Sequence, residues 1–162
     1  MNKEVDGRAG RPASNEAARH GTGEADLTVM LAAHDAFRRD LRKLATAASQ
    51  ARSAGSGDRS LPAAADAADE LATQLSRHLT HEERDALPLI GQALTAREWR
   101  DAGRTMGRQA GVGVSFVPEF FGWLLDGAAP DKRAAVLATL PAVMRPLVAN
   151  VFRPLYARRD SW

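Results

Sequence analysis

Three side chains of this chain are of the types that bind transition metals, and their spacing suits helices. His78 and Glu82 are four residues apart in the run LSRHLTHEE, residues 75–83, so a helix would present them on one face about one turn apart. His34 occurs earlier, in the run MLAAHDAF, residues 30–37. Imidazole and carboxylate ligands directed into a helical core are a common way for bundle proteins to hold metals.

We expect all three side chains to face the core. The apolar residues around His34 recur at three- and four-residue steps, and His34 occupies one of these steps. His78 and Glu82 continue a stripe that Leu71 and Leu75 begin. Burying an ionised carboxylate costs on the order of several kcal/mol unless a cation or hydrogen-bond donors compensate it. A metal ion is one such compensation, and a His–Glu hydrogen bond or an arginine is the other.

The elements that position these residues are predicted to be helices. Asp26 is suited to cap a first helix, and Ser60 with Pro62 opens a second that ends near Gly91. The capping box from Thr95 to Glu98 opens a third. Further helical segments are expected at 116–125, 132–140 and 141–157. No window alternates with period two. The fold class is therefore predicted as all-α, an up-down four-helix bundle over residues 26–160 that follows a disordered tail, residues 1–25.

Length and composition limit the remaining choices. The 162 residues suffice for one domain, and the absence of cysteine excludes disulfides and thiolate ligands. No apolar run approaches the roughly 20 residues of a membrane span, and no secretory signal is visible, so we expect a cytoplasmic protein without membrane contact. Four arginines (Arg97, Arg100, Arg104 and Arg108) share a face of the third helix, which we interpret as a solvated surface. No nucleic-acid motif is present, so nucleic acid is not an expected partner.

The residues around these ligands resemble a known family. The run AAHDAF, residues 32–37, with His78, Glu82 and the run ALPL, residues 86–89, is similar to the hemerythrin-like, or HHE, cation-binding domain. The resemblance implies a four-helix bundle in which His34 is the first-helix ligand, His78 the second-helix histidine and Glu82 the carboxylate that bridges the metals. Members of that family bind oxygen, sense oxygen or redox state, or store iron.

The second half of the chain departs from the family pattern. The resemblance implies further ligands from the third and fourth helices, but no histidine follows His81. Two irons want roughly ten or more ligand positions. We therefore expect a degenerate member in which His34, His78 and Glu82 hold a single metal ion. Iron is favoured over zinc, and haem bound through one axial histidine is a less favoured alternative. The expected role is in redox or oxygen-related sensing.

Two other functional classes remain open at this point. One is an enzyme that uses such a metal, or a haem, for oxidative chemistry. The other is a metal-free helical interaction module. The expected partner is a metal ion or a small molecule, and the sequence identifies no protein partner.

Overall fold

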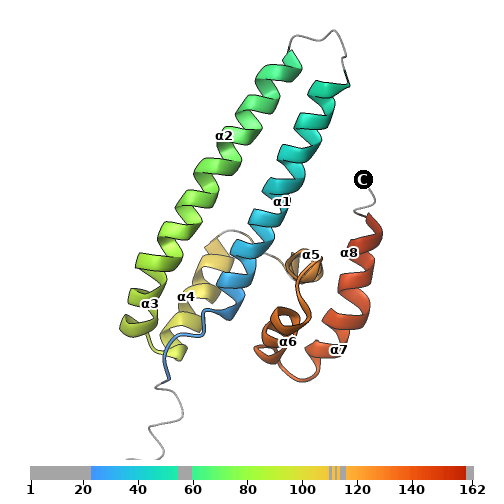
Figure 1. The fold of residues 1–162 in the computed structure, drawn as a ribbon. Helices are drawn as coiled ribbons and strands as arrows, with labels where there is room; N and C mark the ends of the chain where they lie inside the picture. Colours follow the sequence, from blue (N-terminus) through green and yellow to red (C-terminus); the bar gives the residue numbers. More distant parts are fainter. Residues whose placement is uncertain (1–22, 55–59, 110, 112, 114–115, 160–162) are drawn as a thin grey trace, which may run out of the picture.

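Helices make up the regular structure of the protein. The computed structural model describes residues 23–54, 60–109, 111, 113 and 116–159 (Figure 1). The elements are α1 (Thr28–Ser53), α2 (Ser60–His81), η2 (Glu82–Ala86), α3 (Leu87–Ala93), α4 (Ala96–Gln109), α5 (Phe116–Leu125), α6 (Pro130–Ala138), α7 (Met144–Leu147), η3 (Val148–Phe152) and α8 (Arg153–Arg159). The predicted all-α class is confirmed. Of the predicted tail, residues 1–22 lie outside the described residues. None of the described helices has the length and apolar character needed to cross a membrane.

A long antiparallel hairpin of α1 and α2 forms one side of the molecule (Figure 1). The N-cap position of α1 is Leu27, not the predicted Asp26. Asp26, one residue earlier, still accepts a hydrogen bond from the Thr28 N–H at 3.0 Å. The buried apolar side chains of the hairpin are mostly small (Ala36 and Leu41 on α1; Ala65, Ala68 and Leu79 on α2). Small side chains let the two helices approach closely. At the far end, Arg52 of α1 pairs with Asp66 of α2 at 2.8 Å.

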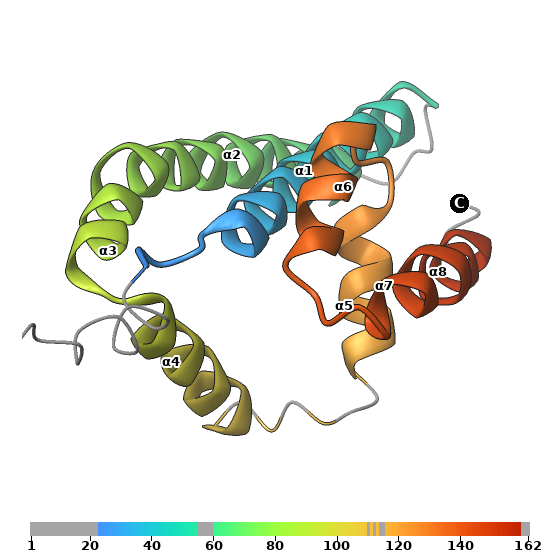
Figure 2. The same ribbon diagram turned by 90° about the horizontal axis from the view of Figure 1, so that it is seen from below.

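A second group of helices, α5 to α8, packs on the opposite side of α1 from α2 (Figures 1 and 2). Its centre is a cluster of fully buried side chains (Leu124, Leu125, Val136 and Val148). Val29, Ala32 and Ala33 of α1 pack against this cluster, so its contact with α1 is near the start of that helix. Three aromatic side chains of α5 are partly buried and pack against the same cluster (Phe120, Phe121 and Trp123).

Helix α4 stands apart from the helices that follow it (Figure 2). The predicted capping box forms: Thr95 Oγ1 accepts from the Glu98 N–H at 3.2 Å, and Glu98 Oε2 accepts from the Thr95 N–H at 2.8 Å. The Ala96 N–H donates to Gly23 O at 2.7 Å, which joins the start of α4 to the segment before α1. No side chain of α4 is buried, and its four arginines lie on an exposed surface as predicted.

Two π-helical turns, η2 and η3, interrupt the helices, and each ends two residues before a proline. The Leu87 N–H bonds Glu82 O across five residues, and Pro88 follows. The Arg153 N–H bonds Val148 O in the same way, and Pro154 follows. Proline has no N–H to donate, and its ring crowds the carbonyl four residues earlier, so a wider turn relieves the conflict. The helix therefore continues through η2 into α3, and Glu82 and Glu83 lie at the start of the wider turn.

Candidate metal site

His34 is a buried histidine between α1 and the end of α2. Its exposed fraction is 3%, which confirms the predicted core position. Its Nδ1 lies 3.0 Å from Glu83 Oε1, and its Nε2 lies 3.8 Å from Glu82 Oε2. The two adjacent glutamates of η2 thus approach opposite nitrogens of one imidazole ring.

Glu83 is held by an arginine of the opposite helix. Arg38 follows His34 by one turn on α1, and its Nη1 and Nη2 donate to the two Glu83 oxygens at 2.6 and 3.1 Å. Arg38 Nη2 also lies 3.3 Å from Thr80 Oγ1 of α2. The guanidinium hydrogen bonds lower the pKa of Glu83; burial opposes this shift, and the His34 hydrogen bond adds to it. Glu83 is therefore an ionised carboxylate at neutral pH.

Glu82 lies between the two predicted histidine ligands. Its Oε2 is 3.8 Å from His34 Nε2 and 3.8 Å from His78 Nε2. Neither separation is a hydrogen bond, which requires about 2.7–3.2 Å. Two ligand atoms that each lie about 2.1 Å from one ion are roughly 3–4 Å apart. Each histidine–Glu82 pair, taken by itself, therefore has the spacing of two ligands of one ion.

His78 is not on the buried stripe, and this part of the prediction was wrong. Its side chain is 66% exposed. The inward-facing stripe has the buried Leu79 and Leu87 and, at the same four-residue steps, the half-buried Leu75 and Glu83. The predicted stripe instead ran through Leu71 to His78. Leu71 is itself 52% exposed. The alanines of α2 left two phases open, and the structure adopts the one that turns Glu83 inward and His78 toward solvent.

His81, the neighbouring histidine, lies off this centre. Its Nδ1 pairs with Asp85 Oδ2 at 2.6 Å on the surface, and its side chain is 68% exposed. Arg84 donates to the same carboxylate from Nε and Nη2, at 2.8 Å each. The prediction that His81 stands outside the ligand set is consistent with this arrangement.

The structure brings together a pair of ligands and a more loosely placed third. Within the described part of the chain, no three His, Asp or Glu side chains converge closely enough to hold an ion. The buried His34 faces the partly exposed Glu82, and the exposed His78 lies 3.8 Å from the same Glu82 oxygen on the solvent side. The donor set of two imidazoles and one carboxylate fits one divalent cation if the exposed His78 side chain turns toward Glu82.

Two residues of this site, Arg38 and Glu83, were not anticipated. A sequence signal existed for both. Arg38 is four residues after His34, so the two share a face of α1. Glu83 is four residues after Leu79 and four before Leu87, both of which are buried. If α2 had been given this phase, the sequence would have predicted an Arg38–Glu83–His34 network with His34 buried and the other two side chains partly exposed.

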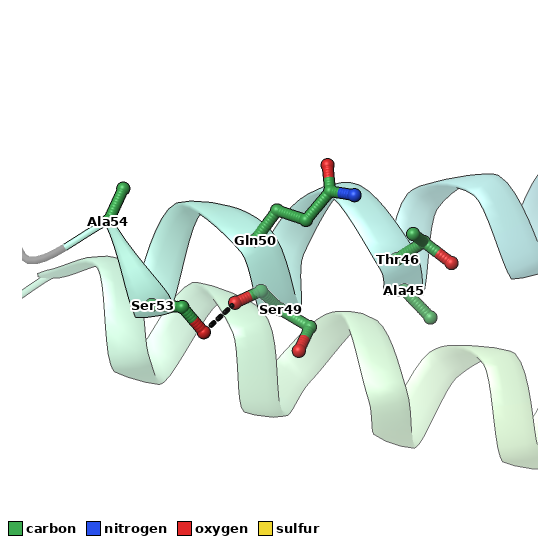
Figure 3. A pocket seen from close by; sticks show the side chains of 6 residues that line it. All are labelled: Ala45, Thr46, Ser49, Gln50, Ser53 and Ala54. Atoms are coloured by element: carbon green, nitrogen blue, oxygen red, sulfur yellow. Dashed lines mark hydrogen bonds between the residues drawn. The ribbon is translucent and has the colours of Figure 1, made fainter.

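A hollow of about 660 Å³ on the far half of α1 offers no comparable chemistry (Figure 3). It is lined by Ala45, Thr46, Ser49, Gln50, Ser53 and Ala54, all from one helix and none ionisable. The hydrogen bond drawn in Figure 3 runs from Ser53 Oγ to Ser49 O at 3.0 Å and is internal to the helix. The candidate site is placed at His34 because a buried imidazole there faces two carboxylates of η2.

Comparison with known proteins identifies the same region of the chain. Residues 12–90, just under half of the chain, match the family model of the Hemerythrin HHE cation binding domain. The match includes His34, His78 and Glu82 and ends in α3, before α4 begins. No curated protein and no solved structure matches the chain. The first half of the chain thus carries a hemerythrin-type, cation-binding family match on the hairpin that holds the candidate site.

Proposed function

We propose that this chain is a hemerythrin-like protein with a reduced site that binds one divalent metal ion weakly. His34 Nε2, a Glu82 oxygen and His78 Nε2 would be the protein ligands. The observation that supports this most directly is the position of Glu82 Oε2, 3.8 Å from both imidazole nitrogens. We propose that the hemerythrin-like bundle spans residues 26–160, so that it extends past the end of the matched region, residues 12–90.

Iron is the metal we propose first. Two imidazoles and one carboxylate leave open coordination positions, an arrangement that suits non-haem iron. When bound, iron would supply a one-electron redox centre open to a small ligand. The chain's own part is to hold His34 rigidly in the interior and to place Glu82 beside it. A redox or oxygen-related sensing role follows from such a site; zinc would bind the same atoms without redox chemistry.

Weak affinity follows from the geometry. His78 is 66% exposed, so metal binding must fix a side chain that lies mostly in solvent, at a cost in conformational entropy. Helices α4 to α8 contain no histidine that could complete the shell. We therefore expect partial occupancy, well below two ions per chain.

Metal content of three matched variants tests the proposal. Protein produced with iron available should contain substoichiometric iron, and His78→Ala and Glu82→Gln should each lower it strongly. His81→Ala is the control, because it removes a histidine from the same helix without touching Glu82. Bound metal should also raise the unfolding temperature of the wild type, since binding energy contributes to folding. Equal metal content in His78→Ala and His81→Ala would contradict the ligand set.

A metal-free helical module is the second candidate, and one observation favours it. No three ligands converge in the described residues. In that case all variants would show background metal content. Two tightly held irons with an oxo-bridge absorption band would contradict both candidates.

A further inference from the structure

The Arg38–Glu83 pair faces the ring nitrogen of His34 that points away from Glu82. We propose that this pair fixes His34 in the Nδ1–H tautomer and so reserves Nε2 as the metal-binding atom. The inference rests on the proposed function only for the metal that Nε2 would bind. The tautomer itself is a property of the metal-free protein, and Arg38 and Glu83 act as positioning residues.

The first step concerns which atom carries the proton. Glu83 receives both terminal nitrogens of the Arg38 guanidinium, at 2.6 and 3.1 Å, in the two-pronged geometry typical of a carboxylate. An ionised carboxylate can only accept hydrogen bonds. Because Glu83 Oε1 also lies 3.0 Å from His34 Nδ1, that nitrogen must be the donor. A neutral imidazole has one N–H, so Nε2 then carries a lone pair.

The second step concerns the other face of the ring. His34 Nε2 lies 3.8 Å from Glu82 Oε2, too far for a hydrogen bond, so this contact does not call for a proton on Nε2. Free histidine in water favours the Nε2–H tautomer. The protein must therefore reverse the ordinary preference, and the Glu83 carboxylate supplies the energy to do so.

The third step concerns why Glu83 stays in place. The Arg38 side chain is 19% exposed. It extends from α1 to the opposite helix, where its guanidinium donates hydrogen bonds to both Glu83 and Thr80. A planar guanidinium that holds both carboxylate oxygens leaves little rotational freedom. Outer carboxylates of this kind commonly orient histidine ligands and raise their basicity.

The chain contains its own comparison for this network. Arg84, Asp85 and His81 repeat the same arginine–carboxylate–histidine chemistry on the surface, with His81 Nδ1 2.6 Å from Asp85 Oδ2. The His81 side chain is 68% exposed, whereas that of His34 is 4% exposed. Water competes with Asp85 for His81, so we expect the surface copy to impose a weaker tautomer preference.

Nitrogen NMR of metal-free protein with ¹⁵N-labelled histidine tests the proposal directly. At about pH 8, where an ordinary imidazole is neutral, two-bond couplings distinguish a protonated from a bare ring nitrogen. His34 should show the Nδ1–H tautomer alone, and His81 a mixture. Glu83→Ala should move His34 toward the free-histidine mixture, and Asp85→Asn should leave His34 unchanged. Glu83→Met keeps a similar side-chain volume, removes both acceptor oxygens and should give the same direction of change if the alanine variant folds poorly.

Zinc titration gives the second readout. Glu83→Ala should weaken zinc affinity by about 10–100-fold, and Asp85→Asn should not. If wild-type protein shows the Nδ1–H tautomer but binds neither zinc nor iron, the proposed function fails while the tautomer inference stands. An Nε2–H tautomer in the wild type, or an unchanged tautomer in both Glu83 variants, would overturn the inference whether or not metal binds.

Discussion

At the scale of single residues, the candidate site depends on which of two adjacent glutamates faces which nitrogen. The interior position of His34 was predicted from the apolar residues that recur at three- and four-residue steps around it. Leu41 on that stripe is buried, whereas Leu31 and Phe37 are 43% and 47% exposed, so the stripe located His34 correctly but is itself only partly covered. The exposure of His78 was not predicted. Alanine is tolerated on either face of a helix, so the run before Leu75 does not fix the phase of α2. Only packing against α1 selects it.

A second polar contact on α1, the partly buried Asp40, is expected to make the stability of the protein depend on pH in the acid range. Burial would raise the pKa of Asp40, but hydrogen bonds from Arg39 and Trp123 outweigh it and hold the pKa below its usual value. Trp123 Nε1 donates to Asp40 Oδ2 at 2.6 Å, which ties α5 to α1. A carboxyl group with a lowered pKa contributes stability above its unfolded pKa of about 3.9 and loses it as pH falls through the folded value.

We therefore expect Asp40→Asn to lower the free energy of unfolding at pH 7 and to have a smaller effect near pH 3. Urea unfolding followed by circular dichroism at the two pH values measures this difference. Asp69→Asn, on the exposed Arg52 pair, is the control and should change stability by only about 0–1 kcal/mol. A loss for Asp40→Asn that is as large at pH 3 as at pH 7 would exclude ionisation of Asp40 as the cause.

At the scale of the element, local signals decided where helices begin more reliably than where they pack. The capping box at Thr95 forms as the sequence predicted. The π-helical turn at Glu82 was not predicted, because the sequence favoured one uninterrupted helix from Ser60 to near Gly91. The chain instead keeps helical dihedrals at His81 and Leu87 and widens one turn. Helix α2 thereby continues into α3.

Helix α4 should depend on its cap more than on burial, because none of its side chains is buried. Thr95→Ala removes the hydroxyl that accepts the Glu98 N–H and should cost α4 about 1 kcal/mol. Carbon chemical shifts of residues 96–109 would report the lost helicity. Thr105→Ala is the matched control, since Thr105 lies inside the helix and alanine has the higher helix propensity. Equal losses of helicity in both variants would show that the cap is not the cause.

At the scale of the whole molecule, periodicity predicted the helices, whereas the arrangement of the second half was fixed by contacts that no period reveals. The sequence favoured a last element in two parts, and the structure has α6 and then α7 to α8. The sequence did not show that α5 and α8 pack closely at Gly122. Nor did it show that this helix pair lies on one side of α1 while α2 lies on the other. A single small residue at a helix crossing carries no periodic signal, and neither does the tie from Trp123 to Asp40.

Gly122→Ala tests that crossing. A Cβ at this position would lie 2.6 Å from Tyr156 Cβ and 3.2 Å from Phe152 O, so α8 would have to move. Both neighbours are close to or part of the backbone, and such overpacking costs roughly 1–3 kcal/mol.

Gly103→Ala is the matched control: nothing lies within 4 Å of its Cβ on α4, so the substitution should stabilise that helix by up to about 1 kcal/mol. Opposite changes in the free energy of unfolding, measured by chemical denaturation, are therefore expected from the same substitution at two helical glycines. If Gly122→Ala were as stable as the wild type, α5 and α8 would not be in contact at this residue, and the core around Leu124 and Val148 would have to be assembled differently.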